Sequence, residues 1–384
     1  MLNGSLINSK LPQAGTTIFT IMSKLASEHN AINLSQGFPD YSCSQELVEL
    51  IHKNMLAGNN QYAPMQGLLS LREAISKKMD AAYEKKYDAE TEITITAGAT
   101  QAIFTAISTI VYQGDEVIIF EPAYDCYAPA IELYGGKVIP ITLRFPNYTV
   151  DWQEVASLVN TKTRAIIINN PNNPSSSVFN KSDLLQLENI VRNTNIVIIS
   201  DEVYEHLIFD SAEHYSVAHF EGLSKRSFIV YSFGKTYHAT GWKIGYCIAP
   251  KELMSEFRKV HQFNVFCVNH PIQQALAEHM KRTEGYLSLP QFFQQKRDFF
   301  VGKLAGSRFT ILPSKGTYFQ LLSYEKISKE NDVVFAERLI KEFKIAGIPL
   351  SVFYSNKEDN KVLRFCFAKK NETLLRAAEI LKSI

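Results

Sequence analysis

The chain has 384 residues, of which 46% are hydrophobic and 21% charged, and its formal net charge is +1 at pH 7. At roughly 150 residues per domain, this length is enough for two domains with a large buried core. The near-zero charge excludes a general attraction to nucleic acid or anionic membranes, so a small molecule is the expected partner.

Short apolar runs alternate with helical patterns through the middle of the chain. The runs are rich in β-branched residues and lack strict alternation, which is typical of strands buried on both faces of a sheet. A helix is predicted over 99–113, and strands are predicted within 92–98, 115–124, 136–143, 164–171, 195–204, 227–235 and 243–250. This order of elements predicts an α/β fold with an open, mostly parallel sheet.

The pattern changes after about Val260. Long helices are predicted over 271–306, followed by strands within 309–322 and 362–368, which together indicate a smaller α+β domain. The first forty or so residues carry little strand signal and are expected to pack on it. We therefore predict two domains, a large one over 42–270 and a small one formed by 1–41 with 271–384.

The first 15 residues lack the apolar core of a secretory signal, and no apolar run reaches the roughly 18 residues of a membrane helix. The five cysteines are widely scattered and show no CxxC pairing, so we interpret them as reduced thiols. We predict a soluble, cytoplasmic protein that binds neither nucleic acid nor membranes.

Polar residues follow three of the predicted strands. Asn173, Asp201 and Lys235 each come after an apolar run, and Tyr204 lies three residues beyond Asp201. Each has an ordinary alternative explanation, as a turn residue, a helix N-cap or a solvated cation. Ligands of open parallel sheets bind outside the carboxyl ends of the strands, so the joint placement of these residues favours a ligand site.

An amine, a carboxylate, an amide and a phenol together suit pyridoxal phosphate. This cofactor needs a lysine to form an imine, an acid to keep its pyridine nitrogen protonated, and donors for its ring 3-oxygen. The sequence shows no His/Cys/Asp cluster with metal-ligand spacing and no GxSxG motif, so metal ligation and acyl transfer are less favoured.

The cofactor also needs a phosphate site. Gly98, Ala99 and Thr100 follow a predicted strand and open a helix, where backbone N–H groups and the helix dipole attract anions. Gly98 alone would equally suit a simple turn. Lys243 and the Ser232 hydroxyl are close in sequence to Lys235 and are candidates to strengthen the site.

Five segments resemble the class I/II aminotransferases of fold type I, which use pyridoxal phosphate: "SFGKTYHATGWKIGY", "NNPNNPSSSVF", "SDEVYEHLIFD", "QYAPMQGLLSLREAI" and "LRFCFAKK". The likeness runs from about Ile32 to the C-terminus. It is strongest to the bacterial methionine aminotransferases, close to the kynurenine/glutamine transaminase branch. The resemblance implies a large domain with a mostly parallel sheet, a smaller α+β domain and a homodimer with shared active sites.

The resemblance also implies roles for individual residues. Lys235 forms the internal aldimine and acts as the acid/base, and Asp201 pairs the pyridinium nitrogen. Asn173 and Tyr204 hold the ring 3-oxygen, and Tyr124 in "EPAYDCY" stacks on the ring.

The phosphate is bound in the family by residues that match Gly98, Ala99, Thr100, Ser232 and Lys243. Tyr62 matches a tyrosine lent to the neighbouring subunit's phosphate. Arg364 matches the arginine that grips the substrate carboxylate as a bidentate pair, a task that lysine performs poorly. Gly37 in "SQGFPD" matches a glycine that lines the substrate pocket, beside Asn173 and Tyr124.

The chain departs from many relatives after Asn173. They continue with Pro-Thr-Gly or Pro-Leu-Gly, whereas here Pro174 is followed by Ser175 and Ser176. Without glycine, an easy turn with positive φ at Ser176 is not expected. The conformation of this loop is therefore open.

The predicted function is amino transfer from methionine to a 2-oxo acid in ping-pong half-reactions, with aromatic amino acids, glutamine or kynurenine as further donors. No second cation is apparent for a side-chain carboxylate, which argues against dicarboxylic substrates. Phe263 and Phe266 are candidates for the wall of an apolar pocket, although a core stripe explains them equally well. Burial and the nearby Lys243 are expected to lower the pKa of Lys235 and so favour the neutral amine.

Other functions use the same motifs. Carbon–sulfur β-lyases, of the cystathionine lyase type, and cyclopropane-carboxylate synthases employ the same fold and lysine. A regulator with an aminotransferase-like domain would carry a basic DNA-binding extension, for which the chain has no room. A protein that has lost its cofactor is disfavoured, because competent residues occupy every matched cofactor position.

Overall fold

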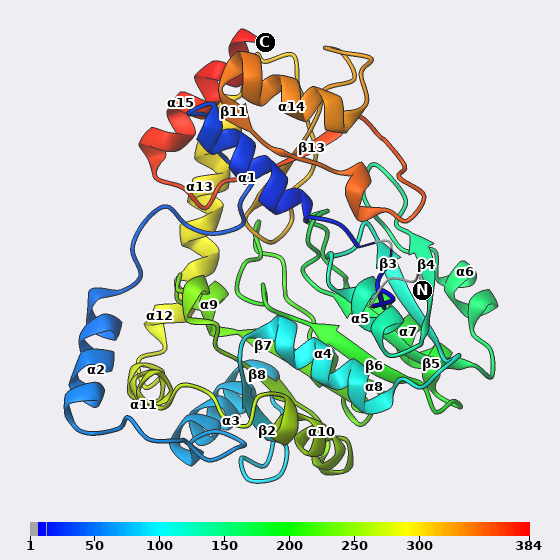
Figure 1. Ribbon diagram of the computed structural model, residues 1–384, viewed down its shortest axis with the longest axis vertical. Helices are drawn as coiled ribbons and strands as arrows, with labels where there is room; N and C mark the ends of the chain where they lie inside the picture. The colour runs from blue at the N-terminus through cyan, green and yellow to red at the C-terminus, as the bar shows by residue number, and fades with distance from the viewer. Residues whose placement is uncertain (1–6, 13) are drawn as a thin grey trace, which may run out of the picture.

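A computed structural model describes residues 7–12 and 14–384. Its centre is a seven-stranded sheet in the order β2-β8-β7-β6-β5-β3-β4 (Figure 1). The strands are β2 (Ile93–Thr96), β3 (Glu116–Glu121), β4 (Lys137–Thr142), β5 (Thr163–Asn169), β6 (Val197–Asp201), β7 (Ser227–Ser232) and β8 (Gly245–Ile248). Only β8 runs antiparallel to its neighbours in this sheet, so the predicted mostly parallel sheet is confirmed.

The apolar strand runs are explained by two hydrophobic cores, one on each face of this sheet. Along β5, Ile166 and Ile168 belong to one core, while Ala165 and Ile167 belong to the other. Successive side chains of a strand point to opposite faces, so a strand buried on both sides needs an unbroken apolar run. The lack of strict alternation in the predicted strands is therefore explained by a sheet that helices cover on both faces.

Helices α4, α5 and α10 contribute to one of these cores, and α3, α6, α7 and α11 contribute to the other. The α-helices of the described residues are α1 (Ile18–Glu28), α2 (Gln45–Leu56), α3 (Leu69–Tyr83), α4 (Ala99–Ile110), α5 (Tyr127–Leu133), α6 (Trp152–Leu158), α7 (Lys181–Val191), α8 (Glu221–Ser224), α9 (Phe233–Thr236), α10 (Lys251–Asn264), α11 (His270–His279), α12 (Glu284–Leu287), α13 (Leu289–Lys303), α14 (Asp332–Phe343) and α15 (Asn371–Ser383). Within these residues, no helix is long and apolar enough to cross a membrane.

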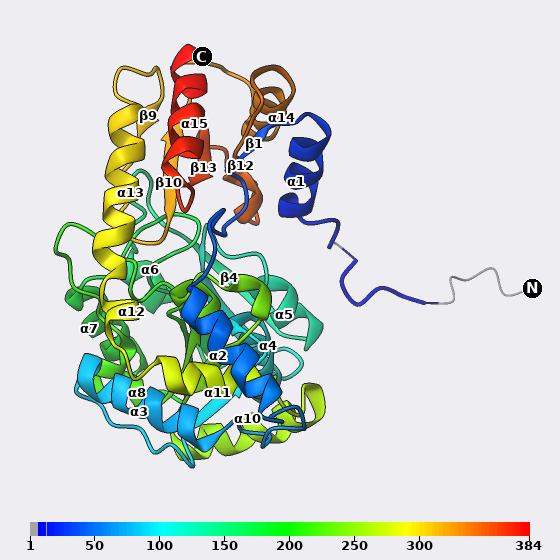
Figure 2. The same ribbon diagram turned by 90° about the vertical axis from the view of Figure 1, so that its left-hand side faces the viewer.

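A second, antiparallel sheet has the order β12-β13-β10-β9. Its strands are β9 (Thr310–Ile311), β10 (Phe319–Ser323), β12 (Ile348–Pro349) and β13 (Val362–Cys366). Beside it, β1 (Ile32–Asn33) pairs in parallel with β11 (Ile345–Ala346), and α1 packs against α14 (Figure 2). The N-terminal segment thus joins elements from the last third of the chain.

Helix α11 packs against α2 and α3, and α13 packs against α15. The division into a large domain, 42–270, and a small domain, 1–41 with 271–384, stays a prediction. Residues 1–6 and 13 of that small domain lie outside the described residues.

Candidate active site

A cavity lies at the carboxyl edge of the seven-stranded sheet. Strand ends and the loops after them supply its lining. The lining residues are Gly98, Ala99, Thr100, Ile103, Tyr124, Asn169, Asn173, Asp201, Val203, Tyr204, Ser232, Gly234, Lys235, Thr240, Lys243 and Ile244. Parallel strands bring their carboxyl ends to one edge, so residues far apart in the chain meet here.

Lys235 lies in α9, directly after β7, and its amine faces acceptors from distant segments. Its Nζ donates hydrogen bonds to the Tyr318 hydroxyl at 2.8 Å and to the Gly37 carbonyl at 3.2 Å. Burial lowers the pKa of Lys235 to about 8, and the Arg364 guanidinium acts in the same direction more strongly than Lys243 does. At pH 7 about one amine in ten is therefore neutral.

Asp201 is the last residue of β6 and is buried at the floor of the cavity. Its Oδ2 accepts a hydrogen bond from the Tyr127 hydroxyl at 2.6 Å, and its Oδ1 accepts one from the Val203 backbone N–H at 3.3 Å. Burial raises the pKa of Asp201 to about 6, while these hydrogen bonds oppose the rise. The carboxyl is thus mainly ionised at pH 7 and is available to a cationic nitrogen in the cavity.

Asn173 and Arg364 form a second polar group beside the cavity. Arg364, in β13, donates from Nη1 to Asn173 Oδ1 at 2.6 Å and from Nη2 to the Ser35 carbonyl at 3.0 Å. Its guanidinium is buried and packs on the Phe319 ring at 3.9 Å, and its Nε has no hydrogen-bond partner. A buried guanidinium with an unused donor suits a carboxylate ligand.

The anion site predicted at the start of α4 is present as backbone geometry. Gly98 has φ +81°, a conformation that glycine adopts at little cost, and Ala99 begins the helix. A Cβ on Gly98 would come within 3.6 Å of Lys243 Nζ, so the cation lies against this helix start. The first N–H groups of a helix have no partner inside it, which suits a phosphate at this point.

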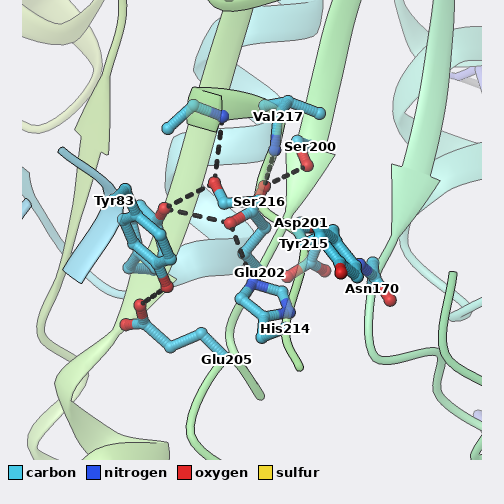
Figure 3. Close-up of polar contacts among 12 residues, drawn as sticks. Tyr83, Asn170, Ser200, Asp201, Glu202, Glu205, His214, Tyr215, Ser216 and Val217 are labelled. Atoms are coloured by element: carbon cyan, nitrogen blue, oxygen red, sulfur yellow. Dashed lines mark hydrogen bonds and ion pairs between the residues drawn. The ribbon is translucent and has the colours of Figure 1, made fainter. Parts of the chain in front are cut away.

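Two other acids follow Asp201 but take part in a network outside the cavity lining. Glu202 accepts hydrogen bonds from Ser200 Oγ at 2.8 Å and from the Val217 N–H at 3.1 Å (Figure 3). Glu205 accepts one from the Tyr83 hydroxyl (Figure 3). It also forms a buried ion pair with Lys78. These contacts involve the two acids that flank Tyr204 in the turn after β6, next to Asp201 at the end of that strand.

The loop at Ser176 differs from the expectation. Ser176 has φ +60°, the left-handed conformation that was not expected without glycine. Its hydroxyl donates to the Phe319 carbonyl at 2.9 Å and lies 3.0 Å from Thr317 Oγ1, and its carbonyl accepts from the Gly316 N–H at 3.1 Å. Hydrogen bonds to the first residue of β10 and to the segment before it therefore compensate for the strained backbone.

Three aromatic residues singled out from the sequence lie away from this cavity. Tyr62 is 81% exposed and Phe263 is 87% exposed. Phe266 is also exposed and makes an edge-to-face contact with Tyr62 at 5.3 Å. Both readings of the phenylalanines, as a pocket wall and as a core stripe, are therefore wrong for the single chain.

The residues around the cavity fit pyridoxal phosphate. The cavity offers an amine, a buried carboxylate, an amide with a phenol, and a glycine-opened helix start with a cation beside it. Among the described residues, no group of three His, Cys, Asp or Glu side chains is placed to hold a metal ion. The amine, the buried carboxylate and the helix start suit the aldehyde, the basic ring nitrogen and the phosphate of this cofactor, respectively.

Sequence reasoning missed Tyr127 and Tyr318. Tyr127 follows Tyr124 by three residues, at the start of α5, which is a spacing that places both near the end of β3. Tyr318 lies immediately before β10, and only the packing of the second sheet brings it to Lys235.

Comparison with known proteins gives a consistent result. Residues 29–381 match the family described as aminotransferase class I and II. The chain is 50% identical to methionine aminotransferase of Escherichia coli over 100% of both chains. It is 34% identical to human kynurenine–oxoglutarate transaminase 3 over 96% of this chain and 88% of that protein.

Solved structures agree with these relatives. The structure of YbdL from Escherichia coli, for which a methionine aminotransferase function was identified, superposes with a TM-score of 0.97, at 50% identity over 99% of this chain and 100% of that one. N-succinyldiaminopimelate aminotransferase from Mycobacterium tuberculosis gives a TM-score of 0.95, at 33% identity over 98% and 99% of the two chains. The predicted fold and the predicted resemblance are both confirmed.

Proposed function

The chain belongs to the class I and II aminotransferases, which use pyridoxal phosphate, and from this premise we propose that it transfers the amino group of methionine to a 2-oxo acid. The observation that carries the proposal is the 50% identity, over the whole chain, to a methionine aminotransferase. Amino acids and 2-oxo acids are the substrates of this family. Aromatic amino acids, glutamine and kynurenine are further proposed donors, in line with the kynurenine transaminase relatives.

We assign the cofactor contacts residue by residue. Lys235 would bind the aldehyde carbon, Asp201 the ring nitrogen, and Asn173 with Tyr204 the ring 3-oxygen, while Tyr124 would cover the ring face. The phosphate would lie at the start of α4. The residues proposed to bind it are Gly98, Ala99, Thr100, Ser232, Lys243 and Tyr62 of the second subunit.

The chemistry follows from what these side chains can do. When bound, the cofactor supplies a carbonyl that combines with amines and a ring that accepts electrons. Lys235 Nζ, which is partly neutral near pH 7, takes the proton from the substrate Cα and returns a proton later, as a general acid and base. Arg364 holds the substrate carboxylate, and Asp201 keeps a negative charge beside the ring nitrogen.

The substrate proposal is tested by following the visible absorption of the cofactor-loaded protein. Added methionine should decrease the visible absorption band of the bound cofactor. A 2-oxo acid, added afterwards, should restore this band. Aspartate should act much more slowly, because Arg364 is assigned to the carboxylate on the substrate Cα and no second cation is assigned to a side-chain carboxylate. The proposal would be contradicted by fast turnover of aspartate with little activity on methionine or phenylalanine. A lyase would be identified instead if cystathionine released pyruvate and ammonia without any added 2-oxo acid.

We also propose a homodimer in which Tyr62 contributes to the partner's site. Tyr62 and Phe266 are exposed and contact one another, and Phe263, three residues earlier in the chain, is exposed as well; exposed apolar patches favour association. The expected result is a solution mass twice that of the 43.5 kDa chain at micromolar concentration. A protein that stays monomeric while fully active would rule out shared active sites.

A cytoplasmic location remains part of the proposal. Its support is that all five cysteines are free thiols, of which Cys126, Cys247 and Cys366 are buried. Cell fractionation would test it, and recovery of the protein outside the cytoplasm would contradict it.

A further inference from the structure

Tyr318 lies between Lys235 and the N-terminal segment. Its hydroxyl donates a hydrogen bond to the Gly37 carbonyl and accepts one from Lys235 Nζ at 2.8 Å. A carbonyl oxygen can only accept, so the single phenolic proton points to Gly37 and an oxygen lone pair faces the amine. The geometry therefore makes the lysine the donor and the tyrosine the acceptor.

Packing fixes the position of this hydroxyl independently of the lysine. The Tyr318 ring is buried and meets Tyr204 edge to face at 5.2 Å, and it also contacts Phe293 and Phe319. Gly37 allows the close approach, because a Cβ there would come within 2.9 Å of Phe319 Cζ. Tyr318 thus directly precedes β10 of the second sheet, whereas Lys235 lies in α9, which follows β7 of the seven-stranded sheet.

Several charged and titratable groups surround the amine. Asp201 and Tyr204 face it from the end of β6, Arg364 and Cys366 from β13, and Lys243 from the segment before β8. Burial is the main cause of the low pKa of Lys235. Arg364 and Lys243 lower this pKa further, whereas Cys366 and Asp201 raise it. Among the described residues, the hydrogen bonds of Nζ go only to Gly37 and Tyr318.

We propose that Tyr318 is a positioning residue for the Lys235 amine. It accepts a hydrogen bond whenever the amine is free and so keeps Nζ at one place in the cavity while the lysine carries a proton. This inference rests on the proposed function. A free lysine side chain samples many rotamers, and a base acts only within hydrogen-bond reach of the proton that it moves. Tyr318 does not itself line the cavity, so it acts through the lysine.

The test compares Tyr318→Phe with the matched control Tyr324→Phe. Both changes keep the ring and remove one hydrogen-bonded hydroxyl beside β10, since Tyr324 donates to the Glu330 carbonyl at 2.9 Å. Tyr318→Phe should lower kcat for methionine by about 10- to 100-fold, with less than about a threefold change in KM. The control should keep the kcat of the wild type, and equal thermal midpoints of the two variants would show that the difference is not one of folding.

A second readout does not depend on turnover. The rate at which the cofactor-free protein takes up pyridoxal phosphate should rise with pH as the amine loses its proton, with a midpoint near 8 in the wild type. Loss of the acceptor destabilises the ammonium form, so the midpoint should fall in Tyr318→Phe and stay unchanged in Tyr324→Phe.

The outcomes separate this inference from the proposed function. Equal kcat and equal uptake midpoints in the two variants would overturn the role of Tyr318. A wild type that takes up the cofactor but transaminates no amino acid would overturn the proposed function, while the uptake midpoints would still decide whether Tyr318 holds the amine.

Discussion

Replacing Lys235 by alanine should abolish transamination, lowering kcat by about 10⁴-fold or more. The variant loses the amine that contacts Tyr318 and Gly37, and with it both the covalent attachment and the base for the substrate Cα. Lys243, which also lines the cavity, cannot replace it, because it lies against Gly98 at the start of α4.

The measurement is the rate of the methionine half-reaction under single-turnover conditions, together with mass spectrometry after borohydride reduction. Reduction should fix the cofactor to Lys235 in the wild type and leave the variant unmodified. Lys296→Ala is a suitable control, because this partly buried lysine also donates to a carbonyl, that of Lys369, but does not line the cavity. Near-normal turnover after Lys235→Ala would show that the assignment of the lysine is wrong.

Arg364→Lys should lower kcat/KM for methionine by about 10- to 10²-fold, in keeping with the roughly 1.5–3 kcal/mol that is typical for one hydrogen bond to a charged group. The guanidinium is held by Asn173 and Ser35 and keeps a free Nε. Lysine offers no planar pair of donors, so the substrate carboxylate would lose its bidentate contact.

The carboxylate is common to all amino acids, so the loss should be similar for methionine, phenylalanine and glutamine. An amine with the methionine side chain but no carboxylate should react slowly and equally with both proteins. Arg226→Lys provides the control, because Arg226 donates from Nη1 to three backbone carbonyls next to the start of β7, at the opposite edge of the sheet. Unchanged apparent affinity for every amino acid would show that another residue binds the carboxylate.

The loop at Ser176 shows where local reasoning fails. The missing glycine argued against a positive φ, yet Ser176 adopts φ +60° because Phe319 and Gly316 hydrogen-bond to it. Those partners lie about 140 residues further along the chain. A backbone preference worth about 1 kcal/mol is readily outweighed by several tertiary hydrogen bonds.

Phe263 and Phe266 show a second limit. Their apolar character predicted burial, either in a pocket wall or in the core, but both side chains are exposed in the single chain. Hydrophobicity identifies residues that gain from leaving water and does not say which surface covers them. A second subunit is the covering surface that we propose.

The sequence by itself determined the seven-stranded sheet and the group of residues at its carboxyl edge. Apolar runs buried on both faces mark the strands, and parallel strands necessarily gather Asn173, Asp201 and Lys235 at one edge. Only the tertiary structure decided how Tyr318 and Gly37 meet the lysine and which donor of Arg364 stays free. These contacts join separate sheets through long-range packing, and no local pattern of residues encodes the distance between two surfaces that fold together.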